Sequence, residues 1–321
     1  MAAQNVFRRG DLSGSNKSCD TDTPPPSTSE ALSNLGGLLI AGWVVAALVV
    51  VLQLGLFVRL RRIVSKAAPE GWRNAIYWQY SIFPFSTLLA LGTLVVPGSY
   101  NFLRSLTPIW VYIAASKFVE LTVRMLDGEE NILALVGEKR FPLASYPFSA
   151  CSPHRKLSWR LLRSMRRAVG QAQYLLAAAA VTTVFLEYAG VIERNQANPG
   201  KISKLLTAIG FLSLLLGLAG LRMFTNLVGS LMPPGHHYEV PSLVLKLAVF
   251  TSKPQILIFN KAFMFSTKTC ISSTSPWVYA GIVESIVLSV EMLLFSLLVY
   301  RTYSDVDQYS SEESKQNPCR E

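Results

Sequence analysis

Four charged side chains recur along one short stretch of the sequence, KFVELTVRMLDGEENIL, which runs from Lys117 to Leu133. Successive residues of a helix turn by about 100°, so Lys117, Glu120, Arg124 and Asp127 share a sector of roughly 80° on a predicted helix. Their signs alternate, which makes Glu120 and Arg124 a favourable i,i+4 pair and Arg124 and Asp127 an i,i+3 pair. Such a stripe compensates its own charge. Inside a membrane it has two interpretations that the sequence leaves open: it fixes helix packing, or it lines a polar path for a solute.

Polar residues also interrupt a second apolar stretch, SLVLKLAVFTSKPQILIFNKAF. Lys246 and Lys253 are seven residues apart and therefore share one helix face. Pro254 removes a backbone donor, which commonly kinks a helix, and Gln255 follows it directly. A kinked polar helix either lines a cavity and moves, or is a static bend.

The last apolar stretch carries Glu284 and Glu291, again seven residues apart, and Arg222 lies in the stretch before Lys246. The two carboxylates are potential counter-ions for basic residues on other helices, although the sequence does not determine which pairs form. The candidate residues of a solute path are Lys117, Glu120, Arg124, Asp127, Arg222, Lys246, Gln255, Glu284 and Glu291.

Enzymatic motifs are absent from the sequence. It has no P-loop, no HExxH zinc motif and no nucleophile elbow. The adjacent His236 and His237 have no third metal ligand nearby. We therefore expect no catalytic residues, no metal and no cofactor, and the chain is not predicted to be an enzyme.

The composition indicates a membrane protein. Only 16% of the 321 residues are charged, against roughly 25% in soluble proteins. The Lys and Arg residues behind the net charge of +10 cluster between apolar stretches, so we expect no nucleic-acid partner. Seven stretches are near or above the roughly 20 apolar residues that cross a bilayer as a helix, namely residues 35–58, 75–96, 105–127, 168–189, 205–231, 240–262 and 276–300. The predicted fold class is an all-α membrane protein with seven transmembrane helices.

The distribution of positive charge predicts the orientation of these helices. The first loop has five Lys or Arg and residues 128–167 have eight, whereas the second loop and residues 263–275 have one each. The positive-inside rule places the two basic loops in the cytoplasm. Residues 1–34 are then an extracellular, disordered tail, and residues 301–321 are a cytoplasmic tail.

Modification sites are predicted from the same topology. The N-glycosylation sequon at Asn16 falls on the predicted outside. Cys19 and Cys270 face the same side, which permits a disulfide between them. Cys151 lies among basic residues of the third loop and is a candidate for lipidation.

Three motifs follow one another in order along the chain: Lys117-Phe118 with Gly128-Glu129 and Ile132-Leu133 downstream, Gln173-Tyr174 at the start of the fourth segment, and Lys246 to Phe250 followed by Gln255. With the basic third loop, this ordered set resembles the organic solute transporter alpha subunit family over about residues 72–309. The chain departs from the family's cysteine-rich third loop, in which it offers only Cys151.

The resemblance implies a carrier of amphipathic organic anions, such as bile acids and conjugated steroids, that works by facilitated, bidirectional transport. It also implies a multi-pass protein of the plasma membrane, made in the endoplasmic reticulum, that assembles with a single-pass beta subunit among membrane lipids. Apolar helix faces suit the rigid body of a sterol, and Lys117, Arg222 or Lys246 suits its anionic end.

Two alternatives remain at this point. One is a seven-helix receptor, although the third segment ends in MLDGEE and lacks the Asp/Glu-Arg-Tyr triplet of such receptors. The other is a lipid-handling or trafficking protein of a related seven-helix family.

Overall fold

The structure is a computed structural model that describes residues 28–137, 140–142, 154–189, 191, 200–232, 238–252, 255, 258–259, 262 and 276–304. Within these residues the chain is almost entirely helical. The α-helices are α1 (Thr28–Ala67), α2 (Glu70–Val95), α3 (Tyr100–Met125), α4 (Glu129–Val136), α5 (Trp159–Tyr188), α6 (Lys201–Gly229), α7 (Glu239–Ser252) and α9 (Pro276–Ser304). The predicted all-helical architecture is confirmed.

Two short connections complete the described chain. A 3-10 turn, η1 (Pro97–Ser99), joins α2 to α3. In the third loop, β1 (Arg140–Pro142) and β2 (His154–Lys156) form an antiparallel pair in which Arg140 lies opposite Lys156. The sequence did not predict these strands, which are too short to carry a hydrophobic alternation.

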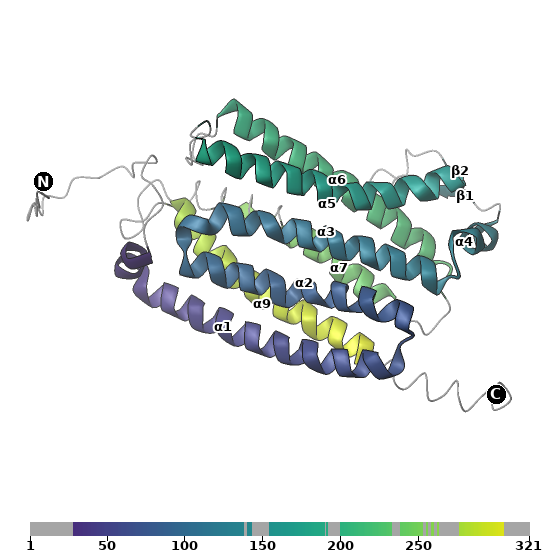
Figure 1. Cartoon of the computed structure of the whole chain (residues 1–321), viewed down its shortest axis with the longest axis horizontal. Helices are drawn as coiled ribbons and strands as arrows, with labels where there is room; N and C mark the ends of the chain where they lie inside the picture. The colour runs from purple at the N-terminus through teal and green to yellow at the C-terminus, as the bar shows by residue number, and fades with distance from the viewer. Residues whose placement is uncertain are drawn as a thin grey trace, which may run out of the picture.

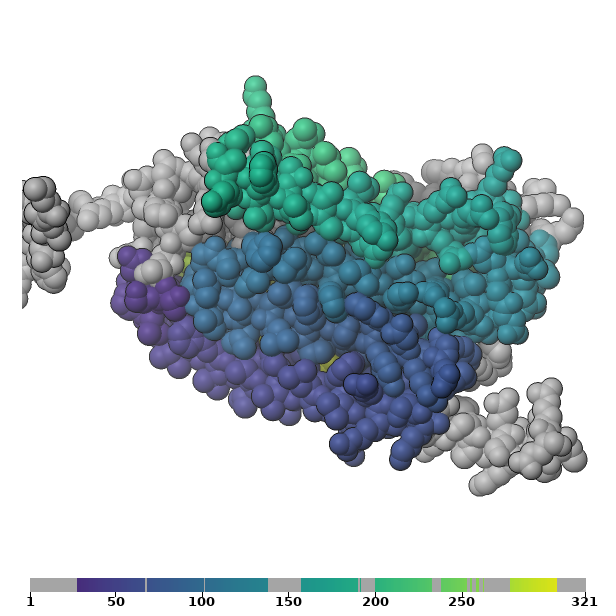
Figure 2. All heavy atoms as spheres, viewed as in Figure 1, coloured from purple at the N-terminus to yellow at the C-terminus, as the bar shows by residue number. Residues whose placement is uncertain are grey.

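The long helices form one bundle (Figure 1), in which α2 packs against α1, α3 and α9. α3 packs against α2, α5, α6 and α7, and α9 packs against α1, α2 and α7. Figure 2 shows α1, α2, α3 and α5 side by side over one face, where they leave only small parts of α9 visible. α1 begins and α9 ends at opposite ends of the bundle (Figure 1). α3 and α9 both pack against α2 and α7, so polar groups of these four helices can meet inside the bundle.

Five helices of the described chain are long and apolar enough to cross a membrane, namely α1, α3, α5, α6 and α9. Their outward faces are hydrophobic: on α1, for example, Ile40, Val44 and Leu48 are exposed, as expected of a surface that meets lipid. α2 is not one of the five, and its polar residues Gln79 and Thr87 are buried in the bundle and not presented to lipid. The count of seven crossings and their orientation stay predictions.

Most helix ends differ from the predicted segments, by up to nine residues at the start of α5 (Trp159, against the predicted residue 168). α1 starts at Thr28, so the end of the predicted disordered tail is helical, and Leu35 interrupts the helix with φ −126° and ψ 24°. α3 ends at Met125 because Asp127 (φ 57°) and Gly128 (φ 103°) adopt left-handed conformations that turn the chain into α4. The prediction that Asp127 belongs to the helical stripe is therefore wrong.

Candidate functional site

The stripe residues that remain on α3 are paired with one another. Lys117 Nζ donates a hydrogen bond to Glu120 Oε2 at 2.9 Å, and Arg124 Nη2 donates to Glu120 Oε1 at 2.6 Å. Arg124 Nη1 also donates to the backbone oxygen of Gly71 in α2 at 3.0 Å. The three charged side chains are 35–51% exposed, and no ion pair joins Arg124 to Asp127. The stripe is thus a partly exposed group in which Glu120 pairs with both Lys117 and Arg124, and Arg124 ties α3 to α2.

The residue after Lys117 positions the start of α7. The ring of Phe118 stacks on that of Tyr238, with centroids 5.3 Å apart and an interplanar angle of 22°. Both side chains are buried, and burial raises the pKa of the Tyr238 phenol, which stays neutral. Phe118 therefore has a packing role between α3 and α7.

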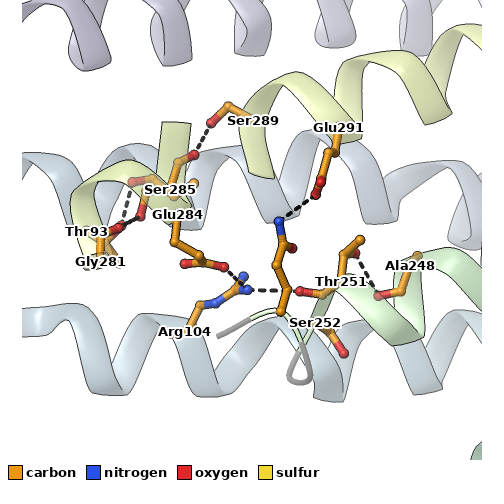
Figure 3. A network of polar contacts seen from close by, with 12 residues as sticks. Thr93, Arg104, Ala248, Thr251, Ser252, Gly281, Glu284, Ser285, Ser289 and Glu291 are labelled. Carbon is orange, nitrogen blue, oxygen red and sulfur yellow. Dashed lines mark hydrogen bonds and ion pairs between the residues drawn. The ribbon is translucent and has the colours of Figure 1, made fainter. Parts of the chain in front are cut away.

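The most buried ion pair among the described residues joins α3 to α9 (Figure 3). Arg104 and Glu284 are 5% and 0% exposed, and Arg104 Nη2 donates to Glu284 Oε1. The same nitrogen donates to the backbone oxygen of Thr251 on α7 at 3.0 Å. One guanidinium thus links three helices.

Sequence reasoning missed Arg104 because it placed this residue in the second loop. α3 begins at Tyr100, so Arg104 lies inside the helix and one turn from its start. The signal that was overlooked is the apolar pair Phe102-Leu103, which precedes Arg104 and extends the hydrophobic segment of α3 back toward the 3-10 turn.

Further polar side chains lie along α9 beside this pair (Figure 3). Gln255 Nε2 donates to Glu291 Oε2 at 3.0 Å, and the hydroxyls of Ser285 and Thr93 lie 2.9 Å apart in a hydrogen bond between α9 and α2. The structure therefore brings the predicted candidates Gln255, Glu284 and Glu291 into one polar region. We call this region, with Arg104, the buried network.

The buried network contains polar atoms that make no hydrogen bond within the described chain. Arg104 Nε and Nη1, Glu284 Oε2 and Gln255 Oε1 are buried and have no hydrogen-bond partner among the described residues. Buried polar atoms without partners are rare, because each costs about 1–3 kcal/mol. The network accordingly offers both donors and acceptors inside the bundle.

Two basic residues lie at matching depths on α6 and α7. Arg222 lies seven residues before the end of α6, and Lys246 lies seven residues after the start of α7. Each is therefore about 10 Å along its helix from that end, at 1.5 Å per residue. α6 packs against α7, and the positive charges are close enough to act on each other. Neither forms an ion pair with an acidic residue of the described chain. We call them the cationic pair.

A cavity of about 620 Å³ opens between α3, α4 and α5. Glu120 of the stripe lines it on one side, and Arg166 on α5 forms an ion pair with Glu129 of α4 across it. The cavity is lined by Ser116, Val119, Glu120, Glu129, Trp159, Arg163, Arg166 and Arg167. Three arginines therefore gather at the end of the bundle where α3 stops and α5 begins.

Several predicted sites lie outside the described residues. These are the glycosylation site Asn16, the cysteines Cys19 and Cys270 of the predicted disulfide, and the lipidation candidate Cys151. Within the described parts of the chain, no group of three His, Cys, Asp or Glu residues is placed to hold a metal ion.

Comparison with known proteins identifies the family. A family model described as organic solute transporter Ostalpha matches residues 38–309, which is most of the chain. The chain belongs to the Ostalpha family. The resemblance found in the motifs around Lys117 and Lys246 is thereby confirmed, since both lie within the matched range. Searches among curated proteins and among solved structures found no match. Membership in the Ostalpha family makes the chain a membrane protein of an organic solute transporter family and not of an enzyme family.

Proposed function

We propose that this Ostalpha-family chain is the multi-pass subunit of a facilitative, bidirectional transporter of amphipathic organic anions, such as bile acids and conjugated steroids. The family match supports transport of an organic solute. The observation that supports an anionic solute is the cationic pair, since Arg222 and Lys246 lie on the packed helices α6 and α7 and have no acidic ion-pair partner in the described chain. Uncompensated charges are costly in an apolar environment, so a bound anion is stabilised by both.

The surroundings of Lys246 suit an amphipathic body. Leu243, Leu247 and Phe250 are exposed on α7, and helical geometry places them within about 100° of Lys246. A rigid sterol packs its apolar rings on such a face while its carboxylate or sulfonate meets the ammonium group. Binding through few contacts stays weak enough to permit release, as transport requires.

The buried network supports α7 as the helix that meets the solute. Thr251 and Gln255 lie at the end of the α7 segment, and the network ties them to Arg104 on α3 and Glu291 on α9. α7 is therefore anchored by polar contacts at one end, and Lys246 lies near its middle, about one and a half turns before Thr251. The proposed path runs past the cationic pair and not through the stripe, in which both basic residues are already paired with Glu120.

Assembly and location follow from the family resemblance alone. We propose that the chain works in the plasma membrane with a single-pass beta subunit, after biogenesis in the endoplasmic reticulum. The faces that α1, α5 and α6 leave exposed are apolar, which supports a position in a bilayer but does not distinguish one membrane from another.

Uptake of labelled taurocholate and estrone sulfate tests the proposal. Cells that express the chain with a beta subunit are expected to take up both solutes, and preloaded cells are expected to release them when the gradient is reversed. Surface biotinylation measures how much protein reaches the plasma membrane. Absence of uptake with and without the beta subunit, at normal surface levels, refutes the proposed function.

The cationic pair is tested by substitution. We expect Lys246→Ala to lower uptake about tenfold at unchanged surface level, because a hydrogen bond to a charged group contributes about 1.5–3 kcal/mol. Arg222→Gln is expected to act in the same direction. Lys204→Ala, at an exposed position near the start of α6, removes the same charge and serves as the matched control. Equal uptake by Lys246→Ala and Lys204→Ala removes Lys246 from the path.

A further inference from the structure

The cavity between α3, α4 and α5 has no role in the proposed transport path. Its volume of about 620 Å³ lies within the roughly 300–1,000 Å³ of small-molecule sites. Three of its lining residues are arginines on the first turns of α5. The question is which ligand these arginines would bind.

Two of the three arginines have no acidic partner. Arg166 forms an ion pair with Glu129, and Glu120 is already hydrogen-bonded by two basic residues of α3. Arg163 and Arg167, one helical turn apart, form no ion pair with any described residue. The cavity therefore has two uncompensated guanidinium groups.

The arrangement of Arg163 suits a phosphate group. Its guanidinium lies 5.1 Å from the ring centroid of Trp159, a cation–π contact that orients the plane of the group. The N–H edges of a stacked guanidinium remain available for bidentate hydrogen bonds, the geometry in which arginine binds phosphate. Trp159 is also the first residue of α5, so the positive end of the helix dipole adds to the field in the cavity.

The position of the cavity indicates a lipid as the source of the phosphate. It lies where α3 ends and α5 begins, and both helices are apolar enough to span a membrane. Tryptophan and arginine at such helix ends lie at the level of the lipid headgroups. By the charge distribution of the loops, this end of the bundle is predicted to be cytoplasmic. A single carboxylate or sulfonate would satisfy one guanidinium, whereas two call for a multiply charged headgroup.

We propose that this cavity binds the phosphorylated inositol headgroup of an anionic membrane lipid, with Arg163 and Arg167 as phosphate ligands and Trp159 as the residue that positions Arg163. The site is separate from the cationic pair, so its test does not depend on the transported solute.

Binding of dioctanoyl phosphatidylinositol 4,5-bisphosphate to the full-length protein in nanodiscs tests the proposal. Microscale thermophoresis measures the affinity, and dioctanoyl phosphatidylcholine, whose headgroup is zwitterionic and net neutral, serves as the comparison. We expect the Arg163→Gln, Arg167→Gln double variant to bind about 30-fold more weakly, at roughly fivefold per arginine near a charged lipid surface. The matched control is the Arg59→Gln, Arg62→Gln double variant, which removes the same charge from exposed positions on α1.

Each outcome decides between the proposal and an alternative. A loss restricted to the α5 variant supports the site, whereas equal losses in both double variants show general surface electrostatics and overturn it. Trp159→Leu keeps the charge and is expected to weaken binding a few-fold through the lost cation–π contact; it tests the cavity even if the double variant fails to fold. Equally tight binding of free inositol 1,4,5-trisphosphate, or displacement of the lipid by taurocholate, overturns the assignment to a lipid.

Discussion

Breaking the Arg104–Glu284 pair should destabilise the protein more than any surface charge change. Glu284→Gln leaves the guanidinium of Arg104 buried, at 5% exposure, without a counter-ion. Removing one partner of a buried pair in this way costs about 3–5 kcal/mol. Replacing both residues by apolar ones, in Arg104→Met with Glu284→Leu, removes the cost of burying both charges and is about neutral. The backbone oxygen of Thr251 then loses its donor, at a cost of about 1 kcal/mol.

Thermal unfolding of the purified full chain in detergent, followed by size-exclusion chromatography, measures these differences. A loss of about 3–5 kcal/mol corresponds to a decrease in Tm of roughly 5–15 °C for a protein of this size class. We expect Glu284→Gln to show this decrease and the double variant to regain at least half of it. Arg62→Met, at an exposed position of α1, is the control, with an expected change below about 2 °C.

The reasoning fails in either of two cases. If Glu284→Gln unfolds at the temperature of the parent protein, the pair is not buried as the structure shows. If the double variant is less stable than the parent protein by the sum of the losses of Arg104→Met and Glu284→Leu measured singly, the two charges do not interact, and the link between α3, α7 and α9 must rest on other contacts.

Three further predictions use the same unfolding assay. Gly217→Ala should lower the Tm, because the added Cβ would lie 2.8 Å from the Cβ of Ala172 and overpacking costs about 1–3 kcal/mol. The control is Gly170→Ala on α5, where the added Cβ would have nothing within 4 Å and the Tm should not fall. Equal losses in the two variants would contradict the close packing of α5 on α6. Glu120→Gln should cost less than about 1 kcal/mol, because its ion pairs are partly exposed; a loss as large as that of Glu284→Gln would show that the stripe is buried in the folded protein. Ser158→Ala should cost about 1 kcal/mol, because the hydroxyl of Ser158 accepts the backbone N–H of Leu161 at the start of α5; an unchanged Tm would show that this cap contributes nothing.

The sequence predicted the helices because long uncharged stretches have few alternatives in a membrane protein. It also predicted the contact between Glu120 and Arg124, since two residues on one helix have a fixed spacing. The contact between Arg104 and Glu284 joins residues 180 positions apart. Its existence depends on how α3 packs against α9, which no local pattern specifies.

Helix ends were the least predictable feature, for physical reasons that differ between them. α1 continues past the apolar stretch to Ala67 because Leu60 and Val64 stay buried while Arg59 and Arg62 face outward. An amphipathic turn of this kind extends a helix beyond the region where hydropathy alone would end it. α3 stops earlier than its charge pattern suggests, because the positive φ at Gly128 turns the chain.

The candidate residues differ in whether they have an oppositely charged partner within the protein. A residue with such a partner is expected to serve helix packing, and one without it is expected to bind the solute. Glu120 accepts hydrogen bonds from Lys117 and Arg124, so an anionic solute gains little by approaching the stripe and must first displace a carboxylate. Lys246 and Arg222 have no carboxylate to displace in the described chain, and an anion there relieves their mutual repulsion. Under the proposed function, an anionic solute is therefore expected to bind at the cationic pair and not at the stripe. The proposed path therefore predicts that substitutions at Lys246 change transport more than those at Lys117.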